Sequence, residues 1–160
     1  MKRQLGLQVV DRRDVVLGAM GAAAFASLLA MGDRASAQTS APSAADWLKS
    51  IHGDAKPTEG KINLDLPEIA ENGNTVPFAI AVDSPMSDND YVKAIHVVST
   101  GNPRPEIASF LLTPQSGKAA VSSRMRLGKT QDIVVVAEMS DGKFYMSKRA
   151  VKVTIGGCGG

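Results

Sequence analysis

The only cysteine in this 160-residue sequence, Cys158, is flanked by glycines on both sides. Gly156 and Gly157 precede it and Gly159 and Gly160 follow it, so no neighbouring side chain shields the thiol or binds a metal with it. Because glycine loses the most backbone entropy on ordering, this Gly-Gly-Cys-Gly-Gly segment is predicted to be a flexible arm. A lone cysteine on such an arm indicates intermolecular pairing or a reactive free thiol.

The thiolate is the nucleophilic form of cysteine, and a free thiol with a pKa of about 8.5 is only about 3% ionised at pH 7. The cation nearest to Cys158 in the sequence is Lys152, and nothing closer would lower that pKa. We therefore predict that the active sites of partner proteins activate the thiol. This arrangement also spares an exposed cysteine from adventitious oxidation.

The remaining residue types define no second reactive site. A single cysteine excludes an internal disulfide and a zinc site built on cysteines, and two histidines, His52 and His96, do not favour a histidine-rich metal site. His96 falls in a predicted strand, where packing or surface exposure is its expected role. No Ser/His/Asp set or carboxylate pair stands out by its spacing, so no catalytic residue and no metal ligand is predicted.

The first 37 residues have the three-part pattern of an export signal. A polar segment ends in the pair Arg12-Arg13, an uncharged run over residues 15–32 follows, and Ala35-Ser36-Ala37 matches a cleavage site. The arginine pair, one residue before the apolar run, resembles a twin-arginine signal. We predict cleavage and a periplasmic location. An uncleaved membrane anchor is the alternative, since the apolar run is nearly long enough to span a bilayer.

Cleavage would change the charge balance of the protein. The full sequence has 18 Lys and Arg against 16 Asp and Glu, whereas residues 38–160 have 13 of each. The 123 residues left after cleavage are therefore near neutral and fit one domain. Without a basic stripe, neither nucleic acid nor an anionic membrane surface is a predicted partner.

The elements that must position the arm begin with a short helix and continue as strands. Residues 44–51 are predicted to be helical, with Ser43 as N-cap and Asp46 in the first turn. Trp47 and Ile51 would share one face, which favours packing on the domain edge over a ligand-binding role for Trp47.

From residue 61 onward the apolar residues recur with a period of two, which is typical of β-strands. The predicted strands cover residues 61–66, 76–82, 92–98, 107–112, 121–127, 133–136 and 143–155. The apolar run Ile133–Val136 indicates a strand buried on both faces, Asp141-Gly142 indicates a hairpin, and Pro77 indicates an edge strand. The pattern favours an all-β fold, an immunoglobulin-like antiparallel β-sandwich of about seven strands.

The last predicted strand passes directly into the glycine-rich arm. Val151, Val153 and Ile155 are expected to anchor the strand on the core. Five extended residues reach roughly 16–18 Å, and as a flexible coil they average about 12 Å. The predicted organisation is thus a cleaved signal over residues 1–37, a β-sandwich domain over 38–155 and a swinging arm over 156–160.

Several segments resemble the SoxY family, the carrier subunits of the bacterial sulfur-oxidising (Sox) system. The most specific is the tail Val151–Gly160 with its Gly-Gly-Cys-Gly-Gly terminus. The segments Val82–Met86, His96–Glu106 and Ala137–Gly142 are also similar to the family. The resemblance extends over essentially all of residues 38–160.

The resemblance implies a non-catalytic carrier of thiosulfate oxidation that has no cofactor and holds sulfur intermediates, such as a persulfide, covalently on Cys158. It implies a heterodimer with a second β-sandwich subunit, SoxZ. It also implies three transient partners. These are a haem enzyme that couples thiosulfate to the thiol, a manganese-dependent hydrolase that releases sulfate, and a molybdenum/haem sulfur dehydrogenase.

Three other function classes are weighed against the carrier. A structural or interaction subunit would use Cys158 for a permanent interchain disulfide, but bulkier residues would be expected around it. A ubiquitin-like sulfur carrier would use the carboxylate after Gly159-Gly160, but it needs ATP, which the periplasm lacks. A redox enzyme would need a Cys-x-x-Cys motif or a cofactor signature, and the sequence has neither.

Overall fold

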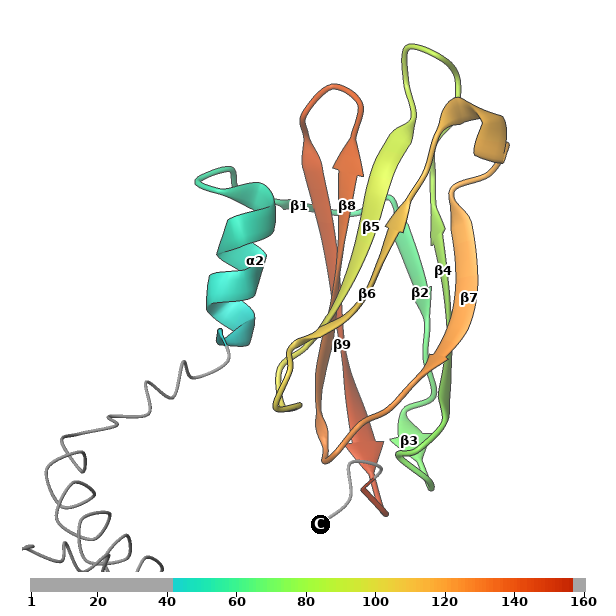
Figure 1. The fold of residues 1–160 in the computed structure, drawn as a ribbon. Helices are drawn as coiled ribbons and strands as arrows, with labels where there is room; N and C mark the ends of the chain where they lie inside the picture. The colour runs from blue at the N-terminus through green and yellow to red at the C-terminus, as the bar shows by residue number, and fades with distance from the viewer. Residues whose placement is uncertain (1–41, 157–160) are drawn as a thin grey trace, which may run out of the picture. The chain divides into compact units, whose positions relative to one another are not determined.

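The structure, a computed structural model, describes residues 42–156 (Figure 1). The predicted signal over residues 1–37 and the segment 157–160 lie outside the described residues. The helix and strands of the described part are α2 (Ala44–His52), β1 (Thr58–Glu59), β2 (Ile62–Asp65), β3 (Ile69–Ala70), β4 (Val76–Val82), β5 (Val92–Ser99), β6 (Glu106–Leu111), β7 (Ala120–Met125), β8 (Gln131–Met139) and β9 (Phe144–Val153). No helix within this range is long and apolar enough to cross a bilayer.

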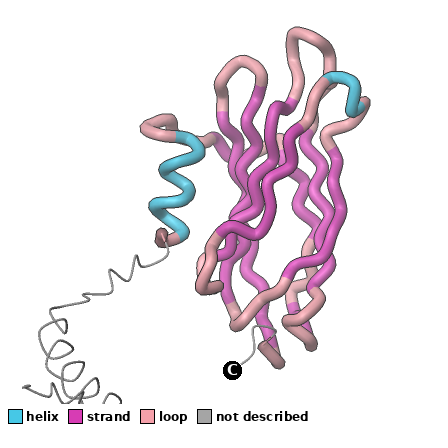
Figure 2. Tube along the Cα trace, viewed as in Figure 1, coloured by secondary structure: helices cyan, strands magenta, loops and turns pink. Residues whose placement is uncertain are grey.

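The strands form two sheets that pack face to face (Figures 1 and 2). The larger sheet has the order β1-β9-β8-β5-β6, with β3 also paired to β9, and the smaller sheet has the order β2-β4-β7. The longer strands all pair antiparallel. The predicted sandwich of seven main strands is therefore confirmed. The sequence pattern missed only β1 and β3, two-residue strands that pair parallel with β9.

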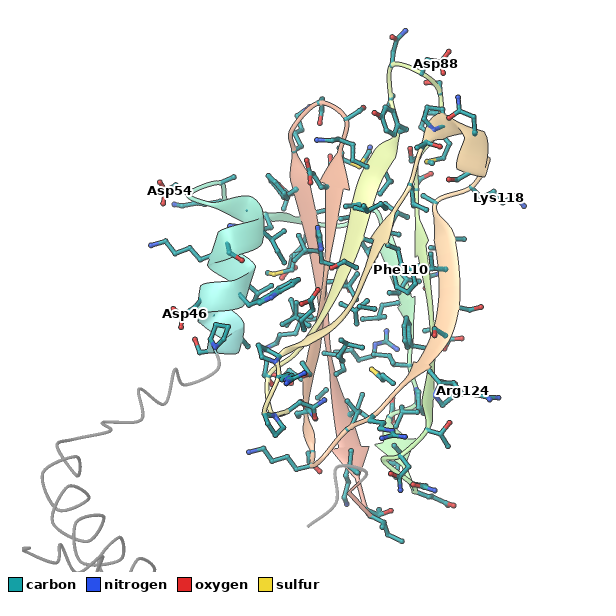
Figure 3. All side chains as sticks on the ribbon, viewed as in Figure 1. Asp46, Asp54, Asp88, Phe110, Lys118 and Arg124 are labelled. Atoms are coloured by element: carbon teal, nitrogen blue, oxygen red, sulfur yellow. The ribbon has the colours of Figure 1, made fainter. Side chains whose placement is uncertain are left out.

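The core lies between the two sheets and follows the period-two pattern. Alternate residues of β4 are buried, among them Phe78 and Ile80. They face buried residues of the larger sheet such as Ile95 and Ile133 in one cluster. Phe110 of β6, labelled in Figure 3, meets the ring of Phe78 edge-on at 6.5 Å between centroids. Burial of this apolar area stabilises the sandwich that carries the arm.

Helix α2 covers the outer face of the larger sheet (Figure 1). Trp47 and Ile51 pack with Val134 and Val136 in a second cluster of apolar side chains. Because one side of β8 faces the core and the other faces the helix, the apolar run Ile133–Val136 is buried on both faces, as predicted.

The N-terminus of α2 is capped as predicted from the sequence. Ser43 Oγ accepts from Asp46 N–H (3.2 Å), and Ser43 N–H donates to the Asp46 carboxylate (3.2 Å). This reciprocal pair satisfies two donors that the first turn of a helix leaves free. The Ser43 hydroxyl also donates to Asp46 Oδ2 (2.7 Å), and this bond, followed by the one from Ser43 N–H, lowers the pKa of Asp46.

The prediction that Pro77 marks an edge strand is wrong. Pro77 lies in β4, which is the central strand of the smaller sheet. On the β7 side Pro77 stands opposite Arg124, but on the other side β2 ends where Asp65 pairs with Ala79. Pro77 is therefore placed beyond the end of β2, so a proline is tolerated there although the strand as a whole is central.

Candidate functional site

The strand that leads into the predicted arm, β9, is held on both sides near its end. On one side Val151 pairs with Gln131 of β8, and Val153 N–H donates to Thr130 Oγ1 (3.0 Å). On the other side Lys152 and Val153 pair with β3. The side chain of Val151 is fully buried in the core. The sheet therefore fixes the chain up to the last residue of β9.

Backbone hydrogen bonds extend this hold beyond the end of β9. Thr154 N–H donates to Ala70 O (3.0 Å), and Thr154 Oγ1 donates to Glu71 O (2.9 Å). Gly73 N–H donates to Ile155 O (2.7 Å). The Ile155 side chain is 67% exposed, so the prediction that it anchors the strand on the core is wrong. Once the chain leaves the sheet, the period-two alternation no longer directs that side chain inward.

Gly156 lies in a place that admits no side chain. A Cβ built on Gly156 would overlap the carbonyl oxygen of Gly128, in the loop 126–130 that joins β7 to β8. The obstacle is backbone, so a larger residue at position 156 must displace one of the two chain segments. The sequence analysis predicted that Gly156 makes the arm flexible. The structure adds that position 156 has no room for a side chain.

The side chain of Asn102 holds the loop that carries Gly128. Its Oδ1 accepts from Gly128 N–H (3.0 Å) and from Gln131 Nε2 (2.8 Å), and its Nδ2 donates to Arg126 O (2.8 Å). The buried Gln131 uses its Oε1 to accept from Gly101 N–H (2.7 Å). These bonds join the loop between β5 and β6 to the loop between β7 and β8, both at the end of the sandwich where β9 ends (Figure 1).

Of the predicted site residues, the structure describes only Gly156. Cys158 and the other three arm glycines, Gly157, Gly159 and Gly160, lie outside the described residues. The candidate site is therefore defined by the base of the arm and the loops beneath it. The sequence analysis assigned no supporting role to Asn102 and included it only in the segment His96–Glu106 that resembles the family. Its position in a glycine- and proline-rich loop was the signal, since Asn side chains bond readily to nearby backbone.

His96 is packed and half-buried, which is one of the two roles that the sequence predicted for it. Its Nδ1 lies 2.9 Å from Ser109 Oγ, and its ring meets that of Trp47 edge-on at 5.9 Å. Burial lowers the pKa of His96, against the opposing charges of Glu138 and Glu106. Among residues 42–156 no group of three or more His, Cys, Asp or Glu is placed to hold a metal ion.

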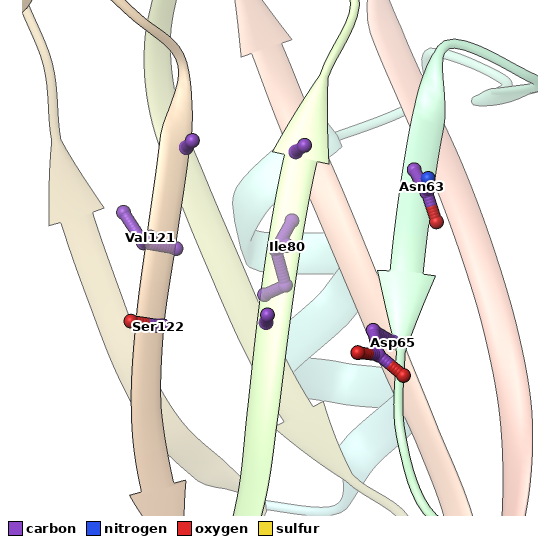
Figure 4. Close-up of a pocket in the computed structure, with 8 residues that line it drawn as sticks. Asn63, Asp65, Ile80, Val121 and Ser122 are labelled. Atoms are coloured by element: carbon purple, nitrogen blue, oxygen red, sulfur yellow. The ribbon is translucent and has the colours of Figure 1, made fainter.

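A shallow hollow of about 310 Å³ lies on the outer face of the smaller sheet (Figure 4). Most of its lining is small, such as Ala79 and Ser122, and Asp65 is its one ionisable group. The lining has no histidine or second carboxylate to work with Asp65 or to activate the Ser122 hydroxyl, so it offers no catalytic arrangement. The hollow is therefore not the candidate site.

A model of the family described as sulfur oxidation protein SoxY matches residues 48–158, a range that ends on Cys158. The chain belongs to the SoxY family. A solved structure, that of the sulfur carrier protein SoxY from Chlorobium limicola f thiosulfatophilum, is 38% identical to this SoxY-family chain, with a TM-score of 0.58. That match covers 69% of this chain and 96% of the Chlorobium chain. The family resemblance expected from the tail and loop segments is confirmed.

Superoxide reductases share the fold of this SoxY-family chain at low identity. The enzyme from Ignicoccus hospitalis is 13% identical, with a TM-score of 0.53 over 59% of this chain and 80% of its own. A putative one from Thermotoga maritima is 15% identical, with a TM-score of 0.53 over 62% and 93%. Identities this low show a common sandwich and say nothing of activity. The comparison with curated proteins found no match.

Proposed function

We propose that this SoxY-family chain is a periplasmic, non-catalytic sulfur carrier that holds thiosulfate-derived sulfur covalently on Cys158 and presents it to partner enzymes. The observation that carries the proposal is the family match, which includes Cys158. The similar Chlorobium protein is described as a sulfur carrier. The anchoring of residues 154–155 also supports the proposal, because it gives an arm a fixed base from which to swing.

The proposed cycle begins when the Cys158 thiolate bonds to the outer sulfur of thiosulfate and an electron pair passes to a haem enzyme. The adduct is Cys–S–S–SO₃⁻. A manganese-dependent hydrolase then uses water to release sulfate, which leaves the persulfide Cys–S–S⁻. A molybdenum/haem sulfur dehydrogenase oxidises the outer sulfur with oxygen from water and takes up the electrons, giving Cys–S–SO₃⁻. A second hydrolysis releases sulfate and returns the thiolate.

In this cycle the carrier contributes reach and presentation, and the partners contribute activation. A free thiol is mostly protonated at neutral pH, so the haem enzyme that forms the first adduct must stabilise the thiolate that reacts. A narrow arm of glycines suits entry into several different active sites, because glycine has no Cβ to widen the chain.

We further propose a stable heterodimer with a SoxZ-like β-sandwich subunit. In the described part of the chain, β2 and β6 are edge strands of the two sheets, and the Leu111 end of β6 lies away from the loops beneath the arm. Open edges offer unpaired backbone groups to another chain. Leu111, at the end of β6, is 82% exposed, and burial of such a side chain against a partner is favourable.

Thiol titration combined with non-reducing electrophoresis tests the carrier against a structural subunit with a permanent interchain disulfide. For a carrier, mild reduction is expected to separate any disulfide-linked dimers and to make the Cys158 thiol titratable. The heterodimer is expected to remain intact. A structural subunit would have no titratable thiol before reduction, and reduction would break its heterodimer. That result would contradict the carrier function.

Export is expected to remove residues 1–37 and to place the protein in the periplasm. N-terminal sequencing of the periplasmic protein is expected to begin at Gln38, since Ala35-Ser36-Ala37 fits the cleavage site. Replacement of Arg12 and Arg13 together by lysine is expected to leave the precursor in the cytoplasm. Cell fractionation measures export. Normal export of that variant would contradict the assignment of a twin-arginine signal.

A further inference from the structure

Three arginines line one groove of about 460 Å³ at the end of the sandwich where β9 ends. Arg104 comes from the loop between β5 and β6, Arg124 comes from β7, and Arg126 directly follows β7. Asn102, which supports the base of the arm, lines the same groove. Figure 3 labels Arg124 on this half of β7, with Lys118 beyond the opposite end of the strand.

The groove carries an excess of positive charge. Within residues 42–156 the ion pairs are Lys93 with Glu138, Lys143 with Asp141 and Lys148 with Asp132, so none of them neutralises a groove arginine. The one acidic residue that lines the groove is Glu106, whose carboxylate accepts a hydrogen bond from Ser109 Oγ (3.2 Å). The lining of the groove therefore has three arginines and a single acidic residue. Guanidinium groups bind oxyanions through paired N–H donors, a geometry that suits a sulfonate.

The groove lies within reach of the arm. Asn102 contacts both Arg126 O and Gly128 N–H, and the carbonyl of Gly128 lies against Gly156. Gly128 is two positions after Arg126 in the chain, so their Cα atoms are about 7 Å apart at most. Cys158 is likewise two positions after Gly156, with the same limit of about 7 Å. A group attached to the thiol extends this reach further.

We propose that the groove of Arg104, Arg124 and Arg126 binds the sulfonate end of the sulfur adduct on Cys158, an inference that rests on the proposed function. The adducts Cys–S–S–SO₃⁻ and Cys–S–SO₃⁻ present three oxygens to the arginines, whereas the free thiol and the persulfide present none. The groove therefore distinguishes sulfonate-bearing states of the carrier from the others. Because the arginines are exposed and screened by salt, the contact is weak enough for a partner enzyme to displace.

The adduct can be installed chemically and observed without any Sox enzyme. Tetrathionate converts the Cys158 thiolate to Cys–S–S–SO₃⁻ as the thiolate attacks an inner sulfur and thiosulfate leaves. Iodoacetamide provides a neutral cap on the same sulfur for comparison. NMR of the guanidinium Nε–H groups is expected to show shifts of the three groove arginines with the sulfonate cap only. High salt is expected to reduce these shifts.

A charge-selective rate gives a second measurement on the uncapped protein. Iodoacetate is an anion and iodoacetamide is neutral, and both alkylate Cys158. The ratio of the two alkylation rates therefore measures how strongly the surroundings of the thiol attract an anion. This ratio is expected to fall on the order of two- to fivefold in Arg124→Gln/Arg126→Gln. Lys118→Gln, which removes a charge at the opposite end of β7, is the matched control and is expected to leave the ratio unchanged.

The proposal is overturned if the sulfonate cap shifts no groove arginine, or if the neutral cap shifts them equally. It is also overturned if free thiosulfate shifts them in Cys158→Ser while the attached sulfonate does not, because the groove would then be a site for a free anion. Since the adduct is made chemically, these outcomes do not depend on whether Cys158→Ser stops sulfur oxidation. Failure of the groove and failure of the carrier function are therefore distinguishable.

Discussion

Cys158→Ser is expected to abolish sulfur-oxidising turnover in a system reconstituted with the partner enzymes, down to the level without carrier. A serine oxygen cannot form the sulfur–sulfur bond that holds the cargo. Folding and partner binding are expected to remain unchanged, because position 158 lies beyond Val151, the last fully buried residue of the range 42–156, and beyond the hydrogen bond to Ile155 O. Thermal unfolding and size-exclusion chromatography with the partner measure these two properties.

Ile155→Ser is the matched control for this variant. It also places a serine near the end of the chain, but the Ile155 side chain is largely exposed and its carbonyl keeps the bond from Gly73 N–H. Most of the turnover is expected to remain. Substantial turnover by Cys158→Ser would contradict covalent carriage on the thiol, and equal loss in both variants would trace the defect to the tail as a whole.

Gly156→Val is expected to slow the partner enzymes by on the order of tenfold or more, the size of effect that a displaced reacting group produces. The new Cβ meets the carbonyl of Gly128, so either the arm leaves the domain in another direction or the loop 126–130 shifts. The valine also stiffens the chain. Overpacking against backbone is expected to lower the free energy of unfolding by about 1–3 kcal/mol.

Gly157→Val and Gly159→Val make the same change further along the arm and separate the two causes. They are expected to slow turnover by stiffening and widening the arm while leaving the free energy of unfolding unchanged. All three variants are expected to keep a titratable thiol. Steady-state kinetics and denaturant unfolding give the comparison. Wild-type stability and turnover in Gly156→Val would contradict the steric role assigned to Gly156.

The sandwich was predictable because its strands follow local rules. Alternation in β4 and the continuous apolar run Ile133–Val136 each report how many faces of a strand are buried. The two errors concern where strands stop. Pro77 lies in a central strand but beyond the end of its neighbour β2, and Ile155 lies beyond the end of β9. A periodic pattern of apolar residues does not show where pairing between two strands ends, because the end also depends on the length of the neighbouring strand.

The supports of the candidate site were not predictable for the same reason. Gly156 and Gly128 are far apart in the sequence and meet only through the fold. Asn102 and Gln131 likewise come together from the loop between β5 and β6 and from the first residue of β8. Cys158 and its glycines, by contrast, stand out by composition alone, because a lone thiol among glycines needs no tertiary contact to be recognised.

Intact mass spectrometry of the protein from thiosulfate-fed cells, isolated without reductant, tests the central claim most directly. The account predicts adducts on Cys158 whose masses correspond to a persulfide, a thiosulfonate or a sulfonate bound through sulfur, each removed by dithiothreitol. Protein from cells grown without thiosulfate provides the comparison. If Cys158 carries no reducible sulfur adduct in cells that are actively oxidising thiosulfate, the result contradicts the carrier function.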